Sequence, residues 1–164
     1  MNPIELLNQA QRLLFDEAAV LDQRRWDDWL ALYTEDCEFW VPAWKSEDQP
    51  TADPGGEVSL VYYDSRVGLE ERVWRIRSAA APAHRLLPRT CHAVHNVRLL
   101  DAAPDRLAVH ATWRVDSYKE KIASSLFGYY DYRLTGRPGA WRIARKKITL
   151  VSDCVPSYFD LYQV

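Results

Sequence analysis

The sequence predicts an α+β fold in which N-terminal helices pack on a strongly curved, mainly antiparallel sheet. Three observations support this prediction. Apolar residues recur at helical spacing near the N-terminus, apolar and polar residues alternate over long stretches of the second half, and turn residues separate those stretches. The 164 residues contain no internal repeat and no low-complexity segment, so we expect one domain spanning residues 1–164.

A long amphipathic helix is expected at the N-terminus. Asn2 is a favoured N-cap residue, Pro3 suits the first helical position, and Glu5 is placed to complete a capping box. One apolar stripe then runs over about five turns. Its positions are Leu6, Leu7, Ala10, Leu13, Leu14, Glu17/Ala18 and Leu21. A second, short helix is expected over 26–33, with apolar positions Trp26, Trp29, Leu30 and Tyr33.

The middle of the chain predicts a strand, a long loop, a second strand and a third helix. Residues 37–42 are aromatic and β-branched, and Pro42 suits a strand end because proline cannot donate to a ladder. The polar segment 45–57 exceeds the usual loop length, so we expect a projecting arm. A short strand over 59–63 follows.

A third helix is expected next, capped by Asp64 or Ser65. Its acidic residues Glu70 and Glu71 come early and its basic residues Arg72, Arg75 and Arg77 come late, which complements the helix dipole. The segment 78–90 ends the helix.

The second half predicts a meander of four long antiparallel strands, over 91–101, 105–118, 121–135 and 140–152. The second of these has one apolar face, made of Leu107, Val109, Ala111, Trp113 and Val115. In the fourth strand the apolar positions change phase between Ile143 and Ile148, which predicts a bulge near Lys146. A bulged, curved sheet covered by the N-terminal helices makes a cone.

The composition excludes several classes of function. A net charge of −2 provides no field for nucleic acid. The cysteines Cys37, Cys91 and Cys154 are odd in number and lack a C-x-x-C pair, so we expect reduced, buried thiols. The chain has no apolar run of membrane-spanning length and no leader pattern, which favours a cytoplasmic location. Aromatic residues make up 12% of the chain, a large supply for a core or an interface.

No motif in the chain supplies a redox centre. A Rieske cluster needs C-x-H and C-x-x-H, which the sequence lacks. Cys91, His92 and His95 resemble a metal-binding run, but on a strand they point to both faces and cannot converge. Glycine-rich nucleotide loops and a G-x-S-x-G elbow are also missing. The basic run 142–147 is interpreted as a solvated or partner-facing side of a strand.

The predicted elements together resemble the NTF2-like, or cystatin-like, cone. Within this fold the run 26–44, the segments 57–64 and 72–77 and the basic strand 142–147 are similar to the small subunits of aromatic-ring-hydroxylating dioxygenases. The C-terminal run 155–164, VPSYFDLYQV, resembles the benzoate, toluate and anthranilate branch of these subunits.

This resemblance implies a non-catalytic beta subunit that works with a large alpha subunit. The implied assembly is an alpha3beta3 hexamer in which the small subunit trimerises. The Rieske 2Fe-2S cluster and the mononuclear iron would lie in the large subunit, so this chain would hold no cofactor, metal or catalytic residue. The candidate subunit contacts are Trp44, Tyr62, Tyr63 and Tyr158. No nucleic acid and no membrane are expected as partners.

Two alternatives come from other classes of function. Small dehydratases and isomerases use the same cone with acid/base pairs, for which His84 or His110 could act with Asp36 or Asp116. Tyr33 or Tyr130 would complete such a site, although His110 falls on the polar face of its strand. The other alternative is a stand-alone ligand-binding or interaction domain.

Overall fold

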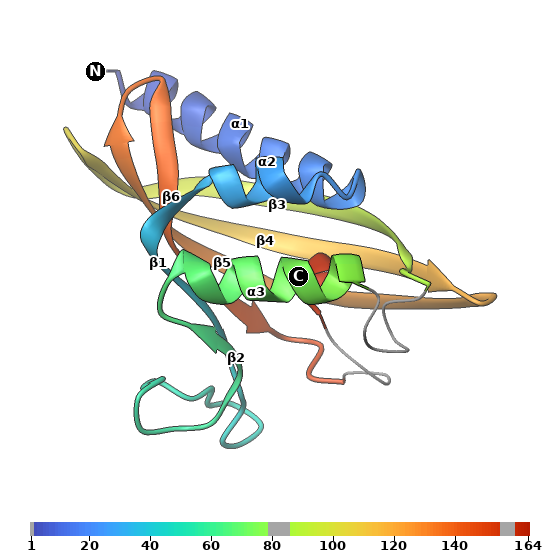
Figure 1. Cartoon of the computed structure of the whole chain (residues 1–164). Coiled ribbons are helices and arrows are strands. Elements are labelled where there is room, and N and C mark those ends of the chain that lie inside the picture. The colour runs from blue at the N-terminus through green and yellow to red at the C-terminus, as the bar shows by residue number, and fades with distance from the viewer. Residues whose placement is uncertain (1, 79–85, 155–159) are drawn as a thin grey trace.

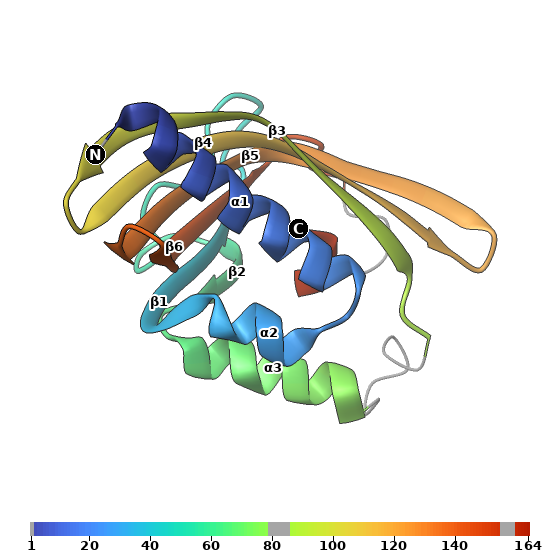
Figure 2. The ribbon, with the colours of Figure 1, turned by 90° about the horizontal axis from the view of Figure 1, so that it is seen from above.

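Three helices cover one face of a six-stranded sheet in this chain (Figure 1). The computed structural model describes residues 2–78, 86–154 and 160–164. The strand order is β2-β1-β6-β5-β4-β3, so β2 and β3 form the two edges. Seen from above, the helices lie side by side over the sheet (Figure 2). We call the sheet face that they cover the inner face and the opposite face the outer face.

The first helix, α1 (Pro3–Asp22), lies where it was predicted and has Asn2 as its N-cap, but the predicted capping box with Glu5 does not form. The Asn2 side chain accepts a hydrogen bond from the Ile4 amide and caps the helix. The buried residues of α1 form one stripe, which packs mainly on β3. They are Leu6, Ala10, Leu14, Glu17, Val20 and Leu21.

The second helix, α2 (Trp26–Ala31), is shorter than predicted, and the prediction was wrong for Tyr33. Tyr33 begins strand β1 (Tyr33–Pro42), four residues before the expected start. Its helical spacing from Trp26 and Trp29 is a local signal. In the folded chain Tyr33 is extended and pairs with Ile143 of β6. The extended backbone places Tyr33 on the same buried face as Cys37, so tertiary contacts outweigh the local helical preference.

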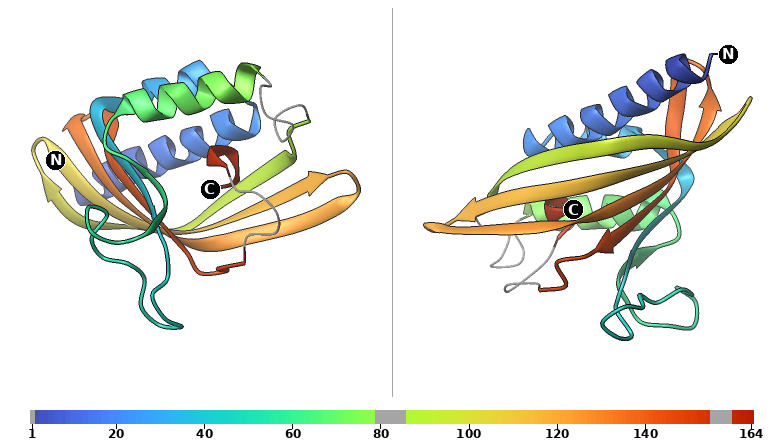
Figure 3. Two further views of the ribbon diagram at one scale, coloured as in Figure 1. Left: turned by 60° about the horizontal axis from the view of Figure 1, so that its bottom comes forward. Right: turned by 180° about the vertical axis from the view of Figure 1, so that it is seen from behind.

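β1 joins the two halves of the chain. It pairs antiparallel with β2 (Ser59–Tyr63) and parallel with the last long strand. Between β1 and β2 the loop 45–57 projects beyond the outer face of the sheet, as predicted (Figure 3). The third helix, α3 (Arg66–Ser78), follows Ser65. Its last turn carries Arg75 and Arg77, but its first turn carries no acidic residue, because the helix starts too early for Glu70 to belong to it.

The predicted meander is confirmed. It consists of β3 (Arg89–Ala103), β4 (Arg106–Lys119), β5 (Ile122–Arg137) and β6 (Ala140–Leu150), each antiparallel to the next. The register of β5 and β6 shifts where Arg133 pairs with Arg145 and Leu134 with Ile143, so Ala144 is the extra residue of a bulge. The bulge lies two residues from Lys146, near the predicted position.

The core fills the space between the inner face and the helices. The predicted apolar face of β4 is fully buried. A short C-terminal helix, η1 (Leu161–Gln163), inserts between the sheet and the helices and buries Leu161 and Tyr162 (Figure 2). Asp160 caps this turn and binds Arg72 of α3 through two hydrogen bonds of 2.9 and 2.8 Å.

Two predictions about burial were wrong. All three cysteines are free, but only Cys37 is buried, because Cys91 lies on the outer face of edge strand β3 and Cys154 follows the last strand. In the basic run of β6, Lys146 is 1% exposed. The bulge at Ala144 turns Lys146 to the inner face, while Arg145 and Lys147 stay on the outer face.

Candidate functional site

The interior of the cone contains a buried ion pair. Glu17 of α1 and Lys146 of β6 approach to 3.1 Å, and their side chains are 2% and 1% exposed. Glu17 Oε1 also accepts a 2.5 Å hydrogen bond from the Tyr33 hydroxyl, and Glu17 Oε2 accepts one of 2.6 Å from Tyr132. The indole of Trp29 donates a further bond to Oε1. The carboxylate therefore has four hydrogen-bond donors from four different elements.

Burial and pairing shift the titration of this cluster. Burial alone would raise the pKa of Glu17, but Lys146 and the hydroxyls of Tyr132 and Tyr33 hold that pKa below its ordinary value. Burial lowers the pKa of Lys146, and Glu17 opposes the shift. The pKa values of both tyrosines lie well above their usual range, because of burial and of the nearby carboxylate. The tyrosines are therefore neutral donors to an ionised carboxylate.

Aromatic rings close this cluster off from solvent. The Lys146 ammonium lies 4.2 Å from the ring centre of Tyr130, which stacks on Trp113 at 5.1 Å. Tyr33 contacts the rings of Trp29 and Phe39 edge-on or tilted. Every member of the ion-pair cluster is bonded within the chain and shielded from water. This arrangement supports a structural role for the interior.

The residues of the predicted acid/base site do not come together. Tyr33 and Tyr130 are buried inside the cone, whereas Asp116 is exposed on the outer face and bound to Arg114. His110 also lies on the outer face, where it meets Asp131 at 2.7 Å. Asp36 is exposed on β1. His84 lies outside the described residues.

A second histidine, His92, is bound by Asp22 at the end of α1. The Asp22 carboxylate lies 2.6 Å from His92 Nδ1 and also accepts bonds from the His92 amide and the Thr90 hydroxyl. That amide belongs to the free edge of β3, so Asp22 satisfies a backbone donor that no strand covers. The pKa of Asp22 is lowered, since these hydrogen bonds outweigh the effect of burial. The contact fastens the end of α1 to an edge strand.

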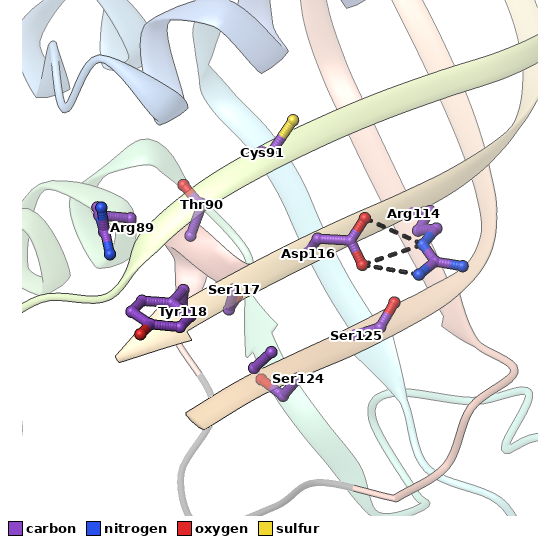
Figure 4. Close-up of a pocket in the computed structure, with 10 residues that line it drawn as sticks. Arg89, Thr90, Cys91, Arg114, Asp116, Ser117, Tyr118, Ser124 and Ser125 are labelled. Atoms are coloured by element: carbon purple, nitrogen blue, oxygen red, sulfur yellow. Dashed lines mark hydrogen bonds and ion pairs between the residues drawn. The ribbon is translucent and has the colours of Figure 1, made fainter. Parts of the chain in front are cut away.

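An open hollow of about 580 Å³ lies on the outer side, where β3 and β5 begin and β4 ends (Figure 4). Its charged groups are already engaged, because Arg114 and Asp116 form an ion pair and the Arg89 guanidinium lies over Tyr118. Cys91 stands at its rim as an exposed free thiol. No lining residue combines with another as an acid/base or nucleophile pair, so the hollow has the features of a surface groove.

Three of the predicted contact residues lie around the arm. Trp44 anchors the base of the arm, because its indole donates a 2.8 Å hydrogen bond to the Leu150 carbonyl. Tyr62 is 40% exposed on the outer face of β2. Tyr63, the next residue, is half-buried against α3. Both tyrosines line a hollow of about 450 Å³ with Arg72 and Asp160. Tyr158 lies outside the described residues.

The described residues do not fit a metal or a membrane helix. Across 2–78, 86–154 and 160–164, no three histidine, cysteine or carboxylate side chains are grouped to hold a metal ion. His92 and His110 are each bound to a carboxylate, on opposite faces of the sheet. No helix in the described part of the chain is long and apolar enough to cross a membrane.

Several known proteins match this chain over most of its length. A family described as "Ring hydroxylating beta subunit" matches residues 16–157. The chain is 36% identical to the 2-halobenzoate 1,2-dioxygenase small subunit of Burkholderia cepacia over 151 residues, covering 92% of each chain. The crystal structure of the beta subunit of benzoate 1,2-dioxygenase from Burkholderia mallei is 34% identical, with a TM-score of 0.80 and coverage of 94% of this chain and 95% of that chain.

A more distant structure bears on the fold class alone. An NTF2-like protein with a cystatin-like fold from Novosphingobium aromaticivorans has a TM-score of 0.64 at 14% identity, covering 90% of this chain and 82% of that chain. The predicted NTF2-like cone is confirmed.

Proposed function

The chain belongs to the family of ring-hydroxylating beta subunits, and we propose that it is the small, non-catalytic subunit of a benzoate-type aromatic-ring dioxygenase. The observation that carries this proposal is similarity over most of the chain to small subunits of halobenzoate and benzoate 1,2-dioxygenases. The reaction is the cis-dihydroxylation of an aromatic acid with O2 and electrons from NADH. The chemistry takes place in the large subunit.

The cone interior supports this assignment over the dehydratase alternative. A dehydratase or isomerase of this fold needs an acid/base pair that a substrate can reach. Here Glu17 and Lys146 are bonded to each other and closed in by aromatic side chains. The two histidine–carboxylate pairs lie on opposite faces of the sheet. His92 and Asp22 join the edge of β3 to α1, whereas His110 and Asp131 lie on the outer face of β4 and β5. The interior therefore fits a structural subunit that has no catalytic site of its own.

The proposed assembly places all redox groups outside this chain. The partner is a large alpha subunit that carries the Rieske cluster and the mononuclear iron, and three copies of each chain form an alpha3beta3 hexamer. Residues 1–164 act as one domain in the cytoplasm. Trp44, Tyr62, Tyr63 and Tyr158 are the proposed contact residues at and near the arm.

Reconstitution tests the proposal. The chain is co-expressed with a large subunit bearing C-x-H and C-x-x-H, and O2 consumption is measured with a matching reductase, NADH and benzoate. We expect the two subunits to co-purify and to consume O2 only in the presence of the aromatic acid. Parallel assays with 2-halobenzoate and anthranilate define the substrate class. Turnover by this chain alone, or failure to co-purify with any such large subunit, would contradict the proposal.

A further inference from the structure

Two arginines face each other directly on the outer face of the sheet. Arg133 of β5 and Arg145 of β6 are register partners, so their Cβ atoms lie about 5 Å apart. Like charges in this position destabilise a sheet unless an anion compensates them. Glu38 compensates Arg145 through a 3.0 Å bond. Arg133 is exposed and forms no ion pair among the described residues.

The two arginines border a small hollow of about 170 Å³. We call it the basic hollow; Ala108 and Leu100 line it from β4 and β3. Asp131 also lines it, and its carboxylate is bound to His110 Nδ1 at 2.7 Å but forms no ion pair with Arg133. The hollow is smaller than a usual small-molecule site of 300 Å³ or more, so it suits a single inserted side chain. Its uncompensated group is a guanidinium, which binds carboxylates best.

The arm, residues 45–57, supplies the opposite charge. It contains four carboxylates and one lysine, and the lysine is paired with Glu57. Glu57 also accepts bonds from the amides of Ala52 and Asp53, so the arm is ordered by its own contacts. Glu47 and Asp48 are exposed near its tip. Such internal order lowers the entropic cost of binding.

The arm and the basic hollow of one copy are placed too far apart to meet. Arg145 pairs with Glu38 of β1, whereas the arm begins after Trp44, six residues and therefore about 20 Å further along the chain. The arm also points away from the sheet (Figures 1 and 3). Between the two regions the outer face carries half-exposed apolar side chains suited to an interface. They are Leu60, Tyr62, Phe127 and Tyr129.

We propose that the acidic arm of one copy docks on the basic hollow of a second copy, with a carboxylate of Glu47 or Asp48 bound by Arg133. The contact joins different surfaces of the two copies, so its repetition closes a ring when the rotation between copies allows it. The three-membered form of that ring rests on the proposed alpha3beta3 function. The contact itself depends only on the charges and shapes described above.

Charge reversal tests the contact in the full-length chain by sedimentation equilibrium. Arg133→Glu and the pair Glu47→Lys with Asp48→Lys should each raise the dissociation constant for self-association by about tenfold or more. All reversals in one chain should restore association, because opposite charges face each other again. Arg12→Glu on α1 and Glu71→Lys on α3 are matched controls on exposed helix positions, and they should change nothing. Arg133→Glu places an acid opposite Arg145, so the sheet should keep its stability.

Co-purification with the large subunit separates this inference from the proposed function. Variants that lose self-association but retain the large subunit would support the arm contact. A wild-type chain that self-associates through the arm but binds no large subunit would contradict the proposed function alone. The inference would be overturned by a monomeric wild-type chain, by self-association that ignores the reversals, or by variants that lose only the large subunit.

Discussion

Glu17 is an acidic residue in the apolar stripe of a helix, and Lys146 is a basic residue in a strand that changes phase. Each irregularity is visible in the sequence. Their pairing is not, because 129 residues separate them and the bulge at Ala144 decides which face Lys146 takes. The interpretation of residues 142–147 as a solvated side was therefore wrong at Lys146, where a one-residue insertion reversed the direction of the side chain.

Lys146→Met should destabilise the fold strongly. It leaves the Glu17 carboxylate buried without its cation, which costs about 3–5 kcal/mol of unfolding free energy. Adding Glu17→Gln should recover most of this loss, because glutamine removes the buried charge, its side-chain oxygen can accept from one tyrosine hydroxyl, and its amide can donate to the hydroxyl oxygen of the other. Urea unfolding of both variants measures the difference. Equal stability of the single and double variants would show that the ion pair does not control this interior.

Acid should destabilise the chain partly through Glu17. Its pKa is lower in the folded chain than in the unfolded chain, so its contribution is complete above the unfolded value of about 4.3 and is lost as the pH falls through the folded value. Asp22 acts in the same direction. The double variant Glu17→Gln/Lys146→Met should therefore lose less stability than the wild type between about pH 5 and pH 3. Urea unfolding at several pH values measures this difference. An equal loss of unfolding free energy in the wild type and the double variant would contradict the role of Glu17 in acid destabilisation.

At the scale of elements, local patterns predicted the helices and the strands but not all of their partners. The meander was predictable because its strands alternate cleanly and have turn residues between them. The parallel pairing of β1 with β6 was not predictable, since it joins residues more than 100 positions apart and no sequence pattern in either strand indicates its partner. The same pairing extends β1 back to Tyr33.

The C-terminal helix η1 depends on Asp160. This carboxylate is 3% exposed, binds Arg72 through two hydrogen bonds and accepts one from the Leu161 amide. Asp160→Ala should lower the unfolding free energy by about 2 kcal/mol, after allowance for the partial exposure of Arg72. Near-ultraviolet circular dichroism should change as well, because Tyr162 lies 6.4 Å from Trp26. Asp153→Ala, at an exposed position, is the control, and an equal effect of both substitutions would contradict this role.

For the whole molecule, the family resemblance predicted more about function than any residue pattern did. The sequence lacks redox motifs, and the structure groups no metal-ligand set among the residues it describes. The structure adds what no motif indicates, namely an interior filled by its own ion pair and an outer face with an uncompensated arginine. Of the predicted contact residues, Tyr62 is exposed and remains a candidate, whereas the indole of Trp44 is bonded within the chain and anchors the arm.

The distribution of iron between the subunits tests whether this chain is a non-catalytic subunit. The purified chain and its complex with the large subunit are analysed for iron and acid-labile sulfide, and the absorption spectrum of each is recorded. We expect the isolated chain to contain no stoichiometric iron and the complex to have a Rieske-type spectrum, which the large subunit retains after separation. Stoichiometric iron in the isolated chain would contradict its role as a non-catalytic scaffold.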